Sequence, residues 1–168
     1  MGRERAVGNN LSEAAIVERA KSMANQWMWA VSLQHDRIAN PRPQDKDFHP
    51  LGIVGINEAD VHFLVIALMR LRRTATTLEH VPKLRESVRS AIQAFDDRLP
   101  WLKRLRDVFE HLEDYAVDSN RRRSDTSRRE LQVWSAGGKG MQFFGYDVDW
   151  EKALSAAKEL YGTVKAAY

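Results

Sequence analysis

Apolar side chains recur every three or four residues in several separate stretches of the chain, and this spacing restricts the possible folds more than any other feature. Such a repeat places one apolar stripe along an α-helix, whereas a half-buried strand would alternate apolar and polar residues. We therefore predict an all-α fold, a four- or five-helix up-and-down bundle with a small β-hairpin before the last helix. The clearest stripe comprises Leu102, Leu105, Phe109, Leu112 and Ala116.

The first predicted helix runs from about Leu11 to Ala39. Asn10 is its expected N-cap, with Glu13 three residues later in the capping-box position. A proline-containing surface loop, "NPRPQDKDFHP", follows this helix. The expected buried stripe comprises Ile16, Ala20, Met23, Trp27, Ala30, Val31, Gln34 and Ile38.

Three further helices are expected in the middle of the chain. The second begins after Asn57 as N-cap, with acidic residues in its first turn, and stops before Pro82. The third covers about 83–95. Pro100 lies in the first turn of the fourth, where its missing N–H costs little.

Residues 131–148 are the one region with strand character. Aromatic and β-branched residues flank Gly137–Gly138–Lys139–Gly140, which predicts the turn of a hairpin. The order of residues differs from a phosphate-binding loop, in which Ser or Thr follows the lysine and a helix begins. Asp149 is the expected cap of the last helix. The apolar face of that helix comprises Trp150, Leu154, Ala157, Tyr161, Val164 and Tyr168.

The composition is that of an ordinary globular protein, and the length of 168 residues suits a single domain, 1–168. The chain has no cysteine, which excludes disulfides and thiolate metal sites and is compatible with the reducing cytoplasm. We expect no secretory signal, because the first residues contain no apolar stretch. The longest apolar run, 63–69, is far shorter than the ~20 residues that cross a bilayer. We therefore expect a cytoplasmic protein with no membrane partner.

The excess positive charge is concentrated in one segment. Residues 118–129 contain five arginines and two aspartates, and the expected loop 119–130 has almost no apolar residue. Such a segment attracts polyanions, of which nucleic acid is the commonest in a cell, although a solvated loop without a partner would look the same. The candidate RNA-binding residues are Arg121, Arg122, Arg123, Arg128 and Arg129.

The segment "LRDVFEHLEDY" contains the candidate catalytic residues Arg106, Asp107 and His111. On a helix Asp107 lies one turn from His111, so its carboxylate can orient the imidazole. Arg106 projects about 140° away from His111, so the two do not meet within one helix. A second copy packed antiparallel would bring the Arg106 of each chain towards the His111 of the other. Glu110, one turn from Arg106, could also pair with it.

These residues resemble the signature of the HEPN domains. That signature is an arginine followed by a polar residue and, after four to six intervening positions, a histidine on a late helix of an all-α bundle. "RDVFEH", residues 106–111, matches it with four intervening residues and aspartate in the polar slot. The resemblance covers this motif and, loosely, the helical architecture. The hairpin at 131–148 is not assigned to the family pattern.

The resemblance implies a metal-independent endoribonuclease that acts as a homodimer, with no cofactor. Many family members are toxins paired with an antitoxin, often a minimal nucleotidyltransferase. In such a site His111 would transfer a proton, Arg106 would bind phosphate oxygens, and Asp107 would orient His111. Two alternatives remain. One is a catalytically inactive HEPN-like bundle that binds RNA or a protein, and the other is a helical interaction domain with no nucleic-acid role.

Overall fold

The computed structural model describes residues 12–40, 58–111, 135–137, 140–143 and 146–168. Within these residues the chain forms five α-helices, two single 3₁₀ turns and three short strands. The α-helices are α1 (Glu13–Ala39), α3 (Glu58–Thr77), α4 (Arg85–Arg98), α5 (Leu102–Glu110) and α7 (Trp150–Lys165). The 3₁₀ turns are η1 (Leu78–His80) and η2 (Pro82–Leu84), and the strands are β1 (Ser135–Gly137), β2 (Gly140–Phe143) and β3 (Tyr146–Asp149).

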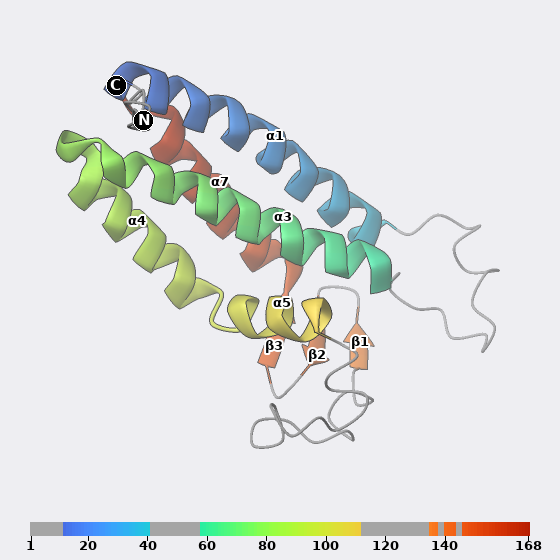
Figure 1. The fold of residues 1–168 in the computed structure, drawn as a ribbon. Coiled ribbons are helices and arrows are strands. Elements are labelled where there is room, and N and C mark those ends of the chain that lie inside the picture. The colour runs from blue at the N-terminus through green and yellow to red at the C-terminus, as the bar shows by residue number, and fades with distance from the viewer. Residues whose placement is uncertain (1–11, 41–57, 112–134, 138–139, 144–145) are drawn as a thin grey trace, which may run out of the picture.

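The predicted all-α bundle is confirmed. The long helices α1, α3, α4 and α7 lie along one another, whereas α5 and the strands lie at their lower end (Figure 1). Helix α3 is central, because it packs against α1, α4, α5 and α7. None of the described helices combines the length and the apolar character that a membrane span requires.

Helix α1 begins at the predicted place, but its cap and its buried face differ from the prediction. The N-cap is Ser12 rather than Asn10, and the Ser12 hydroxyl accepts a hydrogen bond of 3.2 Å from the backbone N–H of Ala15. Met23, expected in the core, is 37% exposed. The helix is rotated so that alanines, which allow close packing, face α3 and α7. The buried residues are Val17, Ala20, Ala24, Met28, Val31, His35 and Ile38.

The next three helices follow the predicted order. Helix α3 ends at Thr77, before Pro82 as expected, and the two 3₁₀ turns connect it to α4. Its predicted cap, Asn57, lies outside the described residues. Pro100 lies two residues before α5 rather than in its first turn, because the helix begins at Leu102 with Trp101 as N-cap.

The predicted hairpin is confirmed, and a third strand extends it. The strands form one antiparallel sheet in the order β1-β2-β3, in which Gly137 pairs with Gly140 and Met141 with Val148. Met141 and Val148 are buried and attach the sheet to the core. The residues 138–139 of the predicted turn lie outside the described part of the chain.

Helix α7 follows β3 without a connecting loop. Asp149 caps it as predicted, since its Oδ1 accepts a hydrogen bond of 2.8 Å from the backbone N–H of Lys152. Tyr168, expected on the buried face, is 87% exposed because the helix ends at Lys165. The buried residues of α7 are Trp150, Ala153, Ala156, Ala157, Leu160 and Val164.

Candidate active site

The candidate catalytic residues lie on α5, which is held firmly against α3. Leu102, Leu105 and Val108 are at most 1% exposed and form the face that packs on the core. Lys103, on the other side of the helix, donates a hydrogen bond of 2.8 Å to Asp96 of α4. Apolar burial and this ion pair therefore fix the backbone from which the exposed side chains of α5 project.

His111 is the C-cap of α5 rather than a residue of its last turn. Its backbone N–H donates to the carbonyl of Val108 at 3.3 Å, and its φ of −135° takes the chain out of the helix. The imidazole is 39% exposed, and its Nε2 lies 4.0 Å from Oδ1 of Asp107. This distance allows electrostatic attraction when the imidazole is protonated but is too long for a hydrogen bond.

Arg106 is paired with Glu110, one turn further along the helix. Its Nη1 lies 2.5 Å from Oε2 of Glu110, and the Arg106 side chain is 26% exposed. Its Nε is buried and has no hydrogen-bond partner within the described residues. A guanidinium has five N–H donors, so the contact with Glu110 leaves capacity for a further anion.

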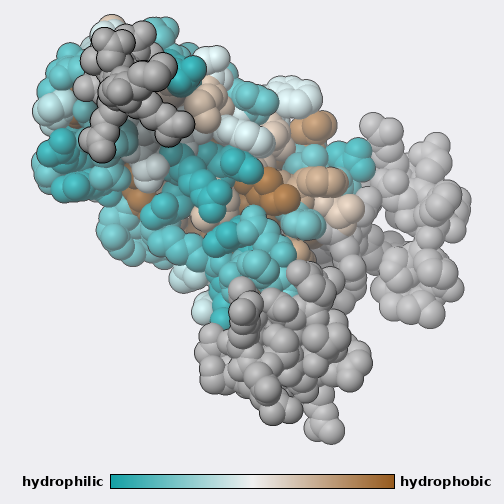
Figure 2. Space-filling model, viewed as in Figure 1, coloured by the Kyte–Doolittle hydropathy of each residue, from teal (hydrophilic) through white to brown (hydrophobic). Residues whose placement is uncertain are grey.

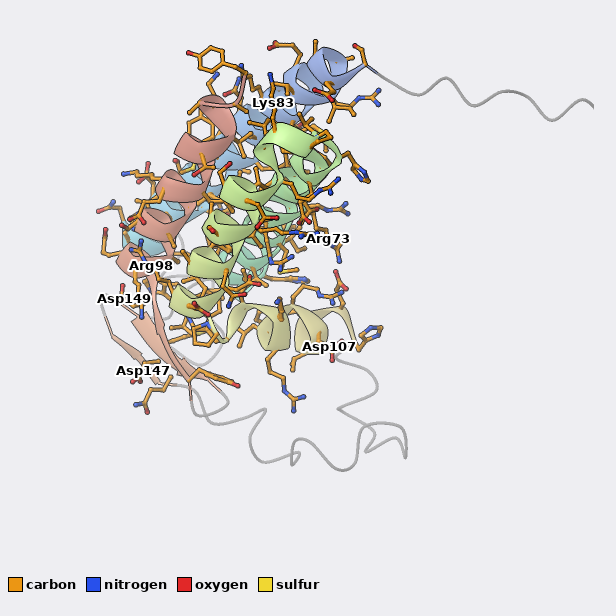
Figure 3. The ribbon with its side chains drawn as sticks, turned by 90° about the vertical axis from the view of Figure 1, so that its left-hand side faces the viewer. Arg73, Lys83, Arg98, Asp107, Asp147 and Asp149 are labelled. Carbon is orange, nitrogen blue, oxygen red and sulfur yellow. The ribbon has the colours of Figure 1, made fainter. Side chains whose placement is uncertain are left out.

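The structure therefore places Arg106 and His111 each beside an acid of α5. Arg106 and Glu110 form one pair, and Asp107 and His111 form the other. Asp107 lies on the outer side of α5, at the edge of the molecule that also carries Arg73 of α3 (Figure 3). Because positions 106 and 111 differ by about 140° around a helix axis, the two pairs point in different directions.

The structure adds a residue of α3, His62, which belongs to none of the sequence motifs. Its ring stacks on that of Phe109, with centroids 4.9 Å apart and an angle of 28° between the planes. Phe109 precedes His111 by two residues, so His62 belongs to the same end of α5. The two rings are 47 positions apart in sequence, and no spacing rule within one helix could have paired them.

The remaining predicted site residues lie outside the described part of the chain. They are the arginines of the basic segment, Arg121, Arg122, Arg123, Arg128 and Arg129. Among the residues that the structure does describe, no group of three or more His, Asp or Glu side chains is arranged to hold a metal ion.

No protein-family model, curated protein or solved structure matches the chain.

Proposed function

We propose that this protein is a metal-independent endoribonuclease of the HEPN type, which cleaves RNA at a composite site between two copies of the chain. The observation that supports the proposal most is the exposed imidazole of His111, five residues after Arg106 at the end of α5, with a carboxylate of Asp107 4.0 Å away. An accessible imidazole beside a carboxylate is suited to proton transfer.

The proposed reaction uses the RNA's own 2′-hydroxyl as nucleophile. The 2′-oxygen bonds to the adjacent phosphorus while the bond to the 5′-oxygen of the next nucleotide breaks, which leaves a 2′,3′-cyclic phosphate and a free 5′-hydroxyl. His111 accepts the proton of the 2′-hydroxyl or protonates the leaving 5′-oxygen. Arg106 offsets the negative charge that develops on the phosphate oxygens. Asp107 positions the imidazole and contacts no substrate atom.

The two acid pairs of α5 support a site shared by two chains. Arg106 and His111 of one chain point in different directions, so a single chain does not present both to one phosphate. A two-fold axis beside α5 would place the Arg106 of each chain opposite the His111 of the other. In such a dimer a phosphate of the RNA would displace the Glu110 carboxylate from the Arg106 guanidinium.

The proposal includes a role for the basic segment and a protein partner. The five arginines of the basic segment, residues 121–129, would hold the RNA backbone without reading its sequence. An antitoxin, such as a minimal nucleotidyltransferase, would bind the protein in the cytoplasm.

A catalytically inactive RNA-binding bundle is the second candidate, and the contact between Arg106 and Glu110 favours it. The carboxylate of Glu110 lies 2.5 Å from Nη1 of Arg106 and already uses part of the hydrogen-bonding capacity of the guanidinium. If a phosphate does not replace it, Arg106 supplies no positive charge to the reaction.

The experiment is RNA cleavage by the purified protein in EDTA, with His111→Ala, Arg106→Ala and the control His80→Ala. His80 is an exposed histidine of η1 and lies outside the candidate site. We expect cleavage by the wild type and by the control, a 2′,3′-cyclic phosphate on the product, and a loss of about 10²–10⁴-fold in the His111 variant. Binding without cleavage would select the inactive bundle, and neither binding nor cleavage would leave the helical interaction domain.

A further inference from the structure

Helices α1 and α3 meet in an antiparallel seam that two contacts define. Near one end, Nε of Arg37 donates to Oδ1 of Asp60 at 2.7 Å. Ten residues further along each helix, the guanidinium of Arg70 lies over the ring of Trp27, 5.9 Å from its centroid. These contacts identify the sides of α1 and α3 that border the seam.

Four arginines follow this seam, and we call them the seam arginines: Arg19, Arg37, Arg70 and Arg73. Arg19 and Arg37 are 18 positions apart, which is five full helical turns, so they lie on the same side of α1. Arg73 lies one turn beyond Arg70 on α3. The distance along α1 from Arg19 to Arg37 is about 27 Å, enough for several nucleotides of an extended strand.

Three of the four seam arginines lack a carboxylate partner among the described residues. Within the described residues, Arg19, Arg70 and Arg73 make no ion pair. Arg37 does pair with Asp60, but that carboxylate is only 5% exposed and the guanidinium side chain is 43% exposed. Four other arginines are bound by carboxylates: Arg72, Arg89, Arg98 and Arg106. The positive charge of Arg19, Arg70 and Arg73 is therefore available to a polyanion.

A series of stacked rings connects the seam to the candidate active site. Phe63 is 54% exposed and precedes Arg70 by two helical turns, so both lie on the same side of α3. Its ring lies 6.1 Å from that of His62, which in turn stacks on Phe109 at 4.9 Å. Phe109 lies three positions after Arg106, on the same side of α5. An RNA strand that follows the seam towards Phe63 would thus arrive beside Arg106.

The figures agree with this arrangement. Arg73 of α3 and Asp107 of α5 lie along the same edge of the molecule (Figure 3). Hydrophobic residues gather on the visible face over α1 and α3 and are bordered by hydrophilic ones (Figure 2). Exposed aromatic rings among unneutralised arginines are typical of surfaces that hold single-stranded nucleic acid, because bases stack on the rings and phosphates bind the guanidinium groups.

We propose that the seam arginines bind the phosphate backbone of single-stranded RNA next to the cleaved bond, and that Phe63 stacks one of its bases. This inference rests on the proposed function for its substrate, but it assigns a separate binding surface formed by α1 and α3. The surface would determine how tightly RNA binds without taking part in the chemical step.

Binding and cleavage are measured separately in the experiment. Binding of a labelled oligouridine of about 16 nucleotides is followed by fluorescence anisotropy in the His111→Ala background, so that no RNA is cut. Arg70→Gln/Arg73→Gln is compared with Lys158→Gln/Lys165→Gln, which removes the same charge from exposed positions of α7. A third variant, Phe63→Ala, removes the ring alone.

We expect the Kd to rise about tenfold in the arginine variant and to stay within about twofold in the lysine control, with the slope of log K against log salt reduced by about 1.4. Phe63→Ala is expected to raise the Kd with an unchanged salt slope, since stacking releases no counterions. With His111 restored, the arginine variant should show a raised KM and an unchanged kcat.

Three outcomes would overturn the inference. One is an arginine variant that binds as tightly as its lysine control, even if the protein cleaves RNA. Another is a change of oligomeric state in place of a change in RNA affinity, which would make the seam a protein interface. The last is a wild-type chain that binds no RNA. Tight RNA binding that depends on the seam arginines, without cleavage, would instead contradict the proposed nuclease activity and support RNA binding by the seam.

Discussion

Arg72 on α3 and Asp96 on α4 form a two-pronged ion pair at the junction of three helices. Nε and Nη2 of Arg72 donate to the two carboxylate oxygens of Asp96 at 2.6 and 2.7 Å, and Lys103 of α5 donates to the same carboxylate at 2.8 Å. The Arg72 and Asp96 side chains are 18% and 19% exposed. One carboxylate therefore connects the central helix, α4 and the helix that carries the candidate site.

The first prediction concerns this carboxylate. Burial alone would raise the pKa of Asp96, but the hydrogen bonds from Arg72 and Lys103 outweigh burial and hold the pKa below its ordinary value. At pH 7 we expect Asp96→Asn to lower the free energy of unfolding by about 2–3 kcal/mol, because Arg72 keeps a largely buried charge without its partner. Urea denaturation of both proteins measures the difference.

The pH dependence of that difference follows from the direction of the pKa shift. A carboxyl with a lowered pKa in the folded state stabilises the protein above its unfolded pKa, about 3.9 for aspartate, and loses this contribution as the pH falls through the folded value. The stabilities of wild type and Asp96→Asn should therefore converge below about pH 4. Asp97→Asn, one residue along on the exposed side of α4, is the control and should change stability little at either pH. A gap between wild type and Asp96→Asn that persists at low pH would contradict the assignment.

The second prediction tests the carboxylate that occupies Arg106. Glu110→Gln removes the charge of Glu110 and keeps its size, so Arg106 becomes available to a phosphate. We expect RNA to bind several-fold more tightly in the His111→Ala background, with a change of at most about 0.5 kcal/mol in stability, as is usual for an exposed pair one turn apart. Glu86→Gln, which removes an equivalent carboxylate 3.7 Å from Arg89 on α4, should leave RNA affinity unchanged. If Glu110→Gln and Glu86→Gln bind RNA with equal affinity, Arg106 does not bind RNA.

The third prediction compares two glycines. A Cβ on Gly140 would overlap the backbone carbonyl of Val148 in the neighbouring strand, whereas a Cβ on Gly162 of α7 would meet no atom within 4 Å. Gly140→Ala should therefore destabilise the protein by about 1–3 kcal/mol, because β2 and β3 must separate. Gly162→Ala should stabilise it by about 0.5–1 kcal/mol, since alanine is the better helix former. Thermal unfolding distinguishes the two, and a stabilising Gly140→Ala would show that the strands do not pair in this register.

Local patterns in the sequence predicted the elements of the fold well. The helices, their order, the Asp149 cap and the hairpin depend on periodicity and turn residues within a few positions of one another, and all are confirmed. The face that a helix buries depends on its neighbours instead. Helix α1 packs through Ala20 and Ala24, whose small side chains allow close approach, while the larger Met23 is left partly exposed.

Contacts between distant segments could not be read from the sequence. His35 is 6% exposed, and its Nε2 lies 3.1 Å from a carboxylate oxygen of Glu151, which is 116 positions away at the start of α7. In the sequence His35 is one polar residue near the end of a predicted helix, and it is not among the residues expected to be buried there. The pairing of His62 with Phe109 likewise depends on how α5 crosses α3. Each becomes evident only when two helices are placed together.

The last prediction tests whether two chains share the site, which the directions of Arg106 and His111 on α5 favour. Arg106→Ala and His111→Ala are each expected to be inactive alone. When the two are mixed so that subunits exchange, every mixed dimer has one site with an intact Arg106 and an intact His111 and one site with neither. Random exchange makes half of the dimers mixed, so about a quarter of the wild-type activity should return. A double variant, Arg106→Ala/His111→Ala, mixed with either single variant supplies no complete site and should recover nothing. A mixture of the single variants that forms dimers yet stays inactive would mean that both residues must come from one chain, which the separate ion pairs with Glu110 and Asp107 oppose.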